Sequence, residues 1–63
     1  MIKFIISPDG TVTDKDGKLV YQSSTSSQQD AREAVHQTIT EKGYTIDEEW
    51  EMDDDTIELT FHT

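Results

Sequence analysis

The chain has 63 residues, no cysteine, a formal net charge of −9 at pH 7 and a pI near 4.2. This length allows one small domain, residues 1–63, with marginal stability and little volume for a catalytic cleft. The negative charge disfavours direct binding to nucleic acid or to an anionic membrane, because both repel a surface of the same sign.

The opening residues, Met1–Ser7, contain a shorter apolar run than a secretory signal peptide requires. No stretch approaches the roughly 20 apolar residues that a membrane-spanning helix needs. The absence of cysteine fits a reducing compartment. We therefore expect a soluble, cytoplasmic protein.

Residues 1–22 have the pattern of antiparallel strands separated by turns. Residues 2–6 alternate as a strand does, with Ile5 making both of its faces apolar. The sequences Ser7–Gly10 and Asp14–Gly17 are both typical of turns and end in glycine, which accepts a positive φ. Residues 11–22 can form one strand or two, and we favour one long strand that is kinked or interrupted.

A helix is predicted from about residue 27 to residue 42. Ser26 and Gln29 have the spacing of a capping box, and Asp30 lies near the positive end of the helix dipole. Gly43 follows at the position where a left-handed residue commonly ends a helix. The face expected to pack on a sheet consists of Ala31, Ala34, Val35, Thr38 and Ile39.

Two more strands are predicted after the helix. Residues 44–52 alternate almost regularly, so Trp50 is expected in the core. Glu48 is the one exception on that face, and it is expected at the periphery of the sheet or beside Lys42 or Lys3. Residues 57–62 alternate again. The predicted fold class is α+β, in the order ββαββ, with a small antiparallel sheet and one helix packed on one face.

Negative charge is concentrated in the last twenty residues, which carry eight carboxylates and neither lysine nor arginine. Side chains two apart on a strand share a face and lie about 7 Å apart. Alternation would thus gather the carboxylates of two adjacent strands on the solvated face, where like charges oppose folding. The predicted partner-binding surface consists of Asp47, Glu49, Glu51, Asp53, Asp54, Asp55 and Glu58.

No catalytic, cofactor or metal site is predicted. Carboxylates on an open face lack the pocket that shifts a pKa for acid–base catalysis. His36 and His62 have the positions of surface histidines. Counting back from Gly10 or Gly17 does not place acidic residues where an EF-hand needs them, and no glycine-rich phosphate loop is present.

In size, element order and charge layout, with the acidic segment Tyr44–Thr63 behind a capped helix, the chain resembles the small phage-encoded anti-CRISPR inhibitors. The resemblance implies a non-enzymatic, stoichiometric inhibitor in the host-cell cytoplasm. Such a protein would occupy the basic nucleic-acid channel of a CRISPR effector complex. The residues that would face the partner's Arg and Lys side chains are Asp47, Glu49, Glu51 and Glu58. Those expected outside the contact are Lys3, Lys15, Lys18 and Arg32.

A structural or assembly module is the alternative interpretation. An edge strand would then pair with another copy, giving a homodimer, or with a larger protein. The acidity would serve only solubility or protection of a sheet edge. Salt separates the two hypotheses, because binding by mimicry weakens steeply as salt rises whereas strand pairing changes little.

Overall fold

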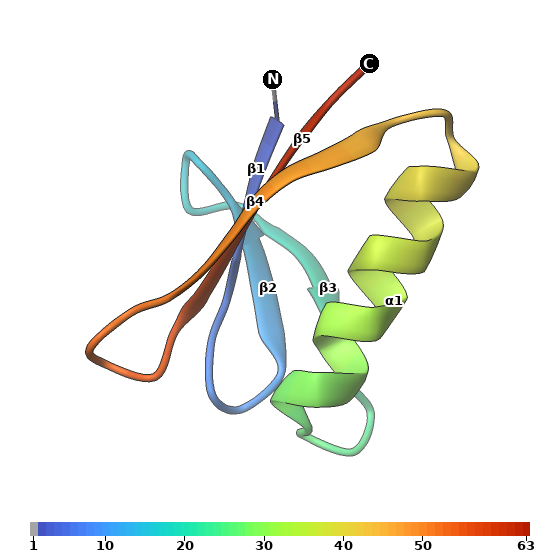
Figure 1. Cartoon of the computed structure of the whole chain (residues 1–63). Helices are drawn as coiled ribbons and strands as arrows, with labels where there is room; N and C mark the ends of the chain where they lie inside the picture. Colours follow the sequence, from blue (N-terminus) through green and yellow to red (C-terminus); the bar gives the residue numbers. More distant parts are fainter. Residues whose placement is uncertain (1) are drawn as a thin grey trace.

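The computed structural model describes residues 2–63, in which five antiparallel strands form one sheet with one helix on one face (Figure 1). The strand order β3-β2-β1-β5-β4 makes β3 and β4 the two edges of the sheet. The α+β class with the helix packed on the sheet is confirmed. The elements are β1 (Ile2–Ile6), β2 (Thr11–Asp14), β3 (Leu19–Gln22), α1 (Gln28–Glu41), β4 (Thr45–Glu51) and β5 (Ile57–His62).

The segment between β1 and α1 forms two strands, so the favoured single long strand is wrong. The Asp14 carboxylate accepts the backbone N–H groups of Asp16 and Lys18, at 2.8 and 3.0 Å. Gly17 has a φ of 84° and donates its N–H to the Asp14 carbonyl at 3.0 Å. These contacts close a full turn, and the chain therefore reverses between β2 and β3.

The turn between β1 and β2 packs closely beneath the start of the helix. Gly10 has a φ of 86° and donates its N–H to the Ser7 carbonyl at 2.9 Å. A Cβ atom at Gly10 would lie 2.7 Å from the Ser23 Cβ. Glycine is thus required here both by the backbone conformation and by the lack of space.

The helix begins one residue later than the capping-box pattern indicated. Ser27 is the N-cap, and its Oγ accepts the Asp30 N–H at 3.3 Å. Ser26 instead has a φ of 55°, outside the helical region. The Ser27 N–H donates to Ser23 Oγ at 3.3 Å, so Ser23 and not Gln29 satisfies the N-cap backbone. The Asp30 carboxylate accepts the Thr25 hydroxyl at 2.8 Å.

The core lies between α1 and the sheet face that it covers. The Phe4 and Phe61 rings meet edge to face with centroids 6.0 Å apart. The buried apolar residues are Ile6, Val12, Ala31, Val35, Ile57, Leu59 and Phe61.

α1 is 14 residues long, and within residues 2–63 no helix is long and apolar enough to cross a membrane.

Candidate acidic interface

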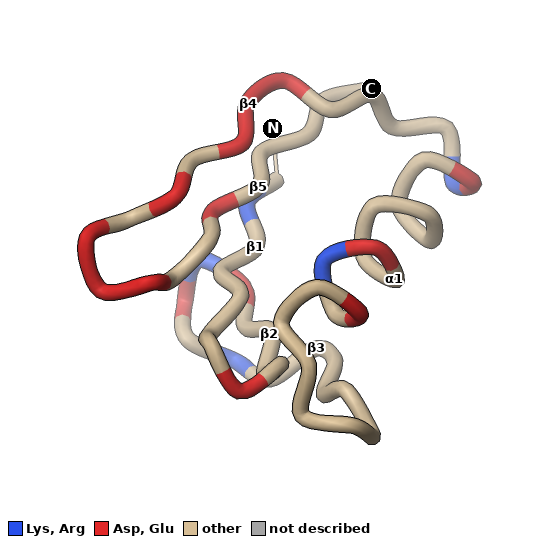
Figure 2. Tube along the Cα trace, turned by 60° about the horizontal axis from the view of Figure 1, so that its bottom comes forward, with Lys and Arg blue, Asp and Glu red and all other residues tan. Residues whose placement is uncertain are grey.

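The excess negative charge lies on β4, β5 and the connecting residues 52–56, which we call the acidic hairpin. Figure 2 shows acidic positions recurring along β4 and around this turn, whereas the lysines and the arginine lie in other segments. The tip of the hairpin projects away from the helix (Figure 1). The concentration of charge seen in the sequence therefore corresponds to one exposed end of the molecule.

A β-bulge at Asp47 divides β4 into two halves. Ile46 pairs with Phe61 and Glu48 pairs with Thr60, so two successive residues of β5 face three of β4. Asp47 is the extra residue. A bulge of one residue resets the alternation, because side chains beyond it exchange faces relative to a regular strand.

The single row of carboxylates predicted from alternation is therefore wrong. Glu49 pairs with Leu59 and Glu51 pairs with Ile57, and both of these partners belong to the core. Glu49 and Glu51 thus lie on the side of the sheet that faces the helix. Glu58 lies on the opposite side, since neighbours along a strand point to opposite faces.

Trp50 lies on the outer face of the sheet, so its predicted place in the core is also wrong. It pairs with Glu58, and 57% of its surface is exposed. Glu48 lies on the same face, and its Oε2 accepts the indole N–H of Trp50 at 2.6 Å. Glu48 was an exception to the alternation because the bulge turns both Glu48 and Trp50 outward.

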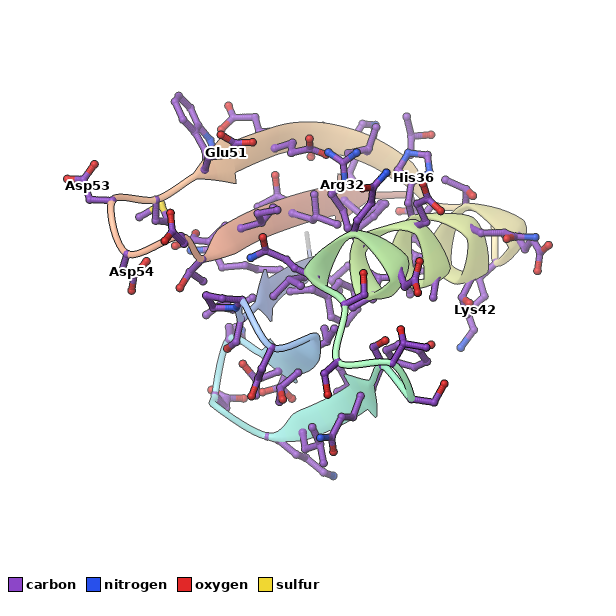
Figure 3. The ribbon with its side chains drawn as sticks, turned by 90° about the horizontal axis from the view of Figure 1, so that it is seen from below. Arg32, His36, Lys42, Glu51, Asp53 and Asp54 are labelled. Atoms are coloured by element: carbon purple, nitrogen blue, oxygen red, sulfur yellow. The ribbon has the colours of Figure 1, made fainter. Side chains whose placement is uncertain are left out.

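Among the described residues, three of the predicted site residues have a basic side chain as neighbour. The Glu49 carboxylate accepts from Arg32 on α1 at 2.6 Å, and Figure 3 shows Arg32 on the helix beside β4. Glu58 lies 3.2 Å from Lys3 Nζ. Asp47 pairs with His62, which carries charge only when protonated. All three pairs are partly exposed and contribute little stability, and the pairs with Arg32 and Lys3 reduce the local negative charge.

The remaining carboxylates of the hairpin lack such neighbours in the part of the chain that the structure describes. Among residues 2–63, ion pairs within 4 Å join only the three pairs just described. Figure 3 shows Asp53 and Asp54 extending away from the ribbon at the tip. Among the described residues, the acidic side chains of the hairpin without a cationic partner are Glu48, Glu51, Asp53, Asp54 and Asp55.

The turn that carries the three consecutive aspartates has a defined shape. Met52 donates its N–H to the Thr56 carbonyl at 2.7 Å, and Asp55 donates to the Met52 carbonyl at 3.1 Å with a φ of 68°. The Asp54 carboxylate accepts the Thr56 N–H at 3.1 Å. Hydrogen bonds from the Thr56 side chain and then from its backbone lower the pKa of Asp54, which favours the charged form.

Gln28 connects this turn to the rest of the molecule. From the first turn of α1, its Nε2 donates to the Asp55 carbonyl at 2.6 Å and to the Ile6 carbonyl at 3.2 Å. The same side chain lines a depression of about 400 Å³ together with Pro8, Glu51 and other hairpin residues. The acidic tip is therefore held by the helix as well as by its own strands. Sequence reasoning missed Gln28, because its two acceptors lie 22 and 27 residues away along the chain.

Two further features of the described residues are their metal-binding capacity and the positions of His36 and His62. Residues 2–63 contain no group of three or more His, Asp or Glu side chains arranged to hold a metal ion. His36 lies on α1 with its ring centroid 6.1 Å from that of Phe61, away from the acidic tip. His62 belongs to the hairpin through its contact with Asp47.

No family model, curated protein or solved structure matches the chain. The resemblance to anti-CRISPR inhibitors stays a prediction. Function is therefore inferred from the charge, exposure and geometry of the acidic hairpin.

Proposed function

We propose that the protein is a non-enzymatic inhibitor that binds a basic, nucleic-acid-binding surface of another protein through its acidic hairpin. A CRISPR effector complex, the target of the inhibitors that the sequence resembles, is the first partner to test. The supporting observation is the group of exposed carboxylates at one end of the molecule that lack cationic neighbours among residues 2–63. Such a group attracts and orients a partner of opposite charge.

We place the centre of the proposed contact at the turn rather than on the strands. Glu49 and Glu58 each lie beside a cationic side chain and contribute less attraction, and Asp47 contacts His62. Consecutive residues in a chain have Cα atoms about 3.8 Å apart. Asp53, Asp54 and Asp55 thus bring three negative charges into one short segment, and one nucleic-acid strand likewise carries a charge about every 3.4 Å.

Trp50 would add contact area that charge alone does not supply. Its side chain is largely exposed on the outer face of the hairpin, and Glu48 fixes the orientation of the indole. Tryptophan is enriched among the residues that dominate binding energies at protein interfaces. An Arg side chain of the partner could lie over the indole ring and reach Glu48 at the same time.

Competition for nucleic acid tests the proposal. The protein is added to purified CRISPR effector complexes that hold fluorescent target DNA, and release of the DNA is followed by anisotropy. We expect displacement that weakens as salt rises. The double variant Glu51→Lys/Asp53→Lys should bind roughly a hundredfold more weakly, because each reversal replaces a weak attraction with a weak repulsion, a change of about 1.4 kcal/mol or tenfold in affinity.

The matched control is Asp16→Lys/Glu41→Lys, which changes the net charge equally at exposed positions outside the hairpin. We expect this variant to displace DNA nearly as well as the wild type. Equal losses in the two double variants would contradict a site on the hairpin. Displacement that strengthens with salt, or none with any complex, would contradict nucleic-acid mimicry.

A further inference from the structure

The edge strand β3 differs in kind from the edge strand β4. β3 contains no charged residue and no proline, and its apolar side chains are exposed: Leu19 by 56%, Val20 by 45% and Tyr21 by 40%. Within residues 2–63, β3 has a neighbouring strand on one side only, namely β2. Its other side therefore presents backbone N–H and C=O groups that another strand can pair with.

Proteins usually protect such an edge with charges, bulges or proline. β4 follows this rule, since it carries a bulge at Asp47 and four carboxylates within Thr45–Glu51. β3 does not follow it. The contrast within one sheet suggests that the edge of β3 is covered in the functional molecule.

An apolar groove lies beside the unprotected edge. It has a volume of about 300 Å³ and runs between β3 and the helix. Apolar side chains on both sides contribute most of its lining, which includes Phe4, Val20, Tyr21, Ala34, Val35 and Ile39. A strand added beside β3 would place alternate side chains over this groove.

The charge distribution favours a second copy of this chain as the occupant. β3 is four strands away from β4 in the sheet order, which corresponds to about 19 Å. If two sheets met at their β3 strands, four strand-to-strand intervals in each sheet and one between the sheets would separate the two β4 strands. At about 4.8 Å per interval, the two β4 strands would be about 43 Å apart. This distance is several times the Debye length of about 8 Å at physiological salt, so two molecules of charge −9 can meet there without strong repulsion.

We propose that two copies of the protein associate by antiparallel pairing of their β3 strands. The result is a closed, two-fold dimer with one continuous ten-stranded sheet and an acidic hairpin at each outer end. The same surface is used by both subunits, so no edge of β3 stays open for further growth. This inference does not depend on the function proposed for the hairpin.

Sedimentation equilibrium of the wild type and of two matched variants tests the dimer. Val20→Lys adds a charge to β3, whereas Met52→Lys adds the same charge to a residue of nearly equal exposure, 45% against 44%, near the other edge. We expect the wild type and Met52→Lys to form dimers, and Val20→Lys to have a dimer dissociation constant at least tenfold higher. Circular dichroism shows whether each variant is folded.

Amide hydrogen exchange of the wild type at low and high protein concentration provides a second test that needs no variant. We expect added protection at high concentration in Leu19–Gln22 and in the adjacent part of α1. A monomeric wild type, a folded Val20→Lys variant that dimerises normally, or protection at β4 instead would overturn the proposal. A molecular mass that keeps increasing with protein concentration beyond that of the dimer would also overturn the proposal, because such growth indicates head-to-tail pairing of β3 with β4.

Discussion

At the scale of single residues, Gly10 and Gly17 share a backbone conformation but have different surroundings. Their φ values are 86° and 84°, yet a Cβ on Gly10 would lie 2.7 Å from the Ser23 Cβ, whereas nothing lies within 4 Å at Gly17. We expect Gly17→Ala to lower the free energy of unfolding by about 1–2 kcal/mol through backbone strain. Gly10→Ala should cost a further 1–3 kcal/mol or so through overpacking. Urea denaturation measures both values, and equal losses would contradict the close packing around Gly10.

The turn hydrogen bonds of Asp54 should appear in the pH dependence of stability. Its folded pKa is below the usual 3.8, so its contribution is present above that value and is lost as the pH falls through the folded pKa. The pKa of Asp9 is lowered in the same direction, first by its backbone hydrogen bond from Thr11. We expect the urea midpoint to decline less steeply below about pH 4 in Asp54→Asn than in the wild type. An equal or steeper decline in the variant would show that the Thr56 contacts are not made in solution.

At the scale of the elements, local patterns predicted the helix and the last strand, because both depend on short-range periodicity. The helix and its polar cap can be read from the sequence to within one residue, and the strand predicted at residues 57–62 is β5, although Thr60 is buried beside its apolar neighbours. The bulge in β4 could not be predicted in the same way. Glu48 marks an irregularity, but only pairing with β5 decides whether one side chain or a whole half-strand changes face.

Deleting single residues from β4 tests the bulge directly. Removing Asp47 should leave the pairing of Ile46 with Phe61 and of Glu48 with Thr60 intact, so stability should change by no more than about 1 kcal/mol. Removing Glu49 would place Trp50 opposite Leu59 and force the indole toward a filled core, at a cost of roughly 1–3 kcal/mol.

Thermal unfolding and the emission of the single tryptophan distinguish the two deletions. We expect solvent-exposed emission to persist after removal of Asp47 and to change after removal of Glu49. If the loss of Asp47 unfolded the protein while the loss of Glu49 was tolerated, the assigned register would be wrong.

At the scale of the whole molecule, the charge is unevenly distributed, and this much could be predicted from the sequence. The net charge and its concentration after Tyr44 require only counting. The pairing of Glu49 with Arg32 could not be anticipated, because it joins β4 to a helix residue 17 positions earlier through a face assignment that depends on the bulge. The acidic residues were therefore assigned to the correct hairpin, but their arrangement on its two faces was predicted wrongly.

Self-repulsion among the carboxylates should make the fold sensitive to salt. We expect the melting temperature to rise between low and physiological ionic strength, because screening weakens repulsion among the exposed acidic side chains. The neutralised variant Glu51→Gln/Asp53→Asn should show a smaller rise. A melting temperature that falls over this range would contradict destabilisation by localised charge.

The contact of Gln28 with both Ile6 and Asp55 has a consequence for recognition. A loop that is already tethered at its base loses less conformational freedom when a ligand arrives. The entropic cost of ordering the tip is incurred when the chain folds, before the protein meets a binding partner. Removing the tether in Gln28→Ala would thus leave every carboxylate in the sequence and still make association less favourable.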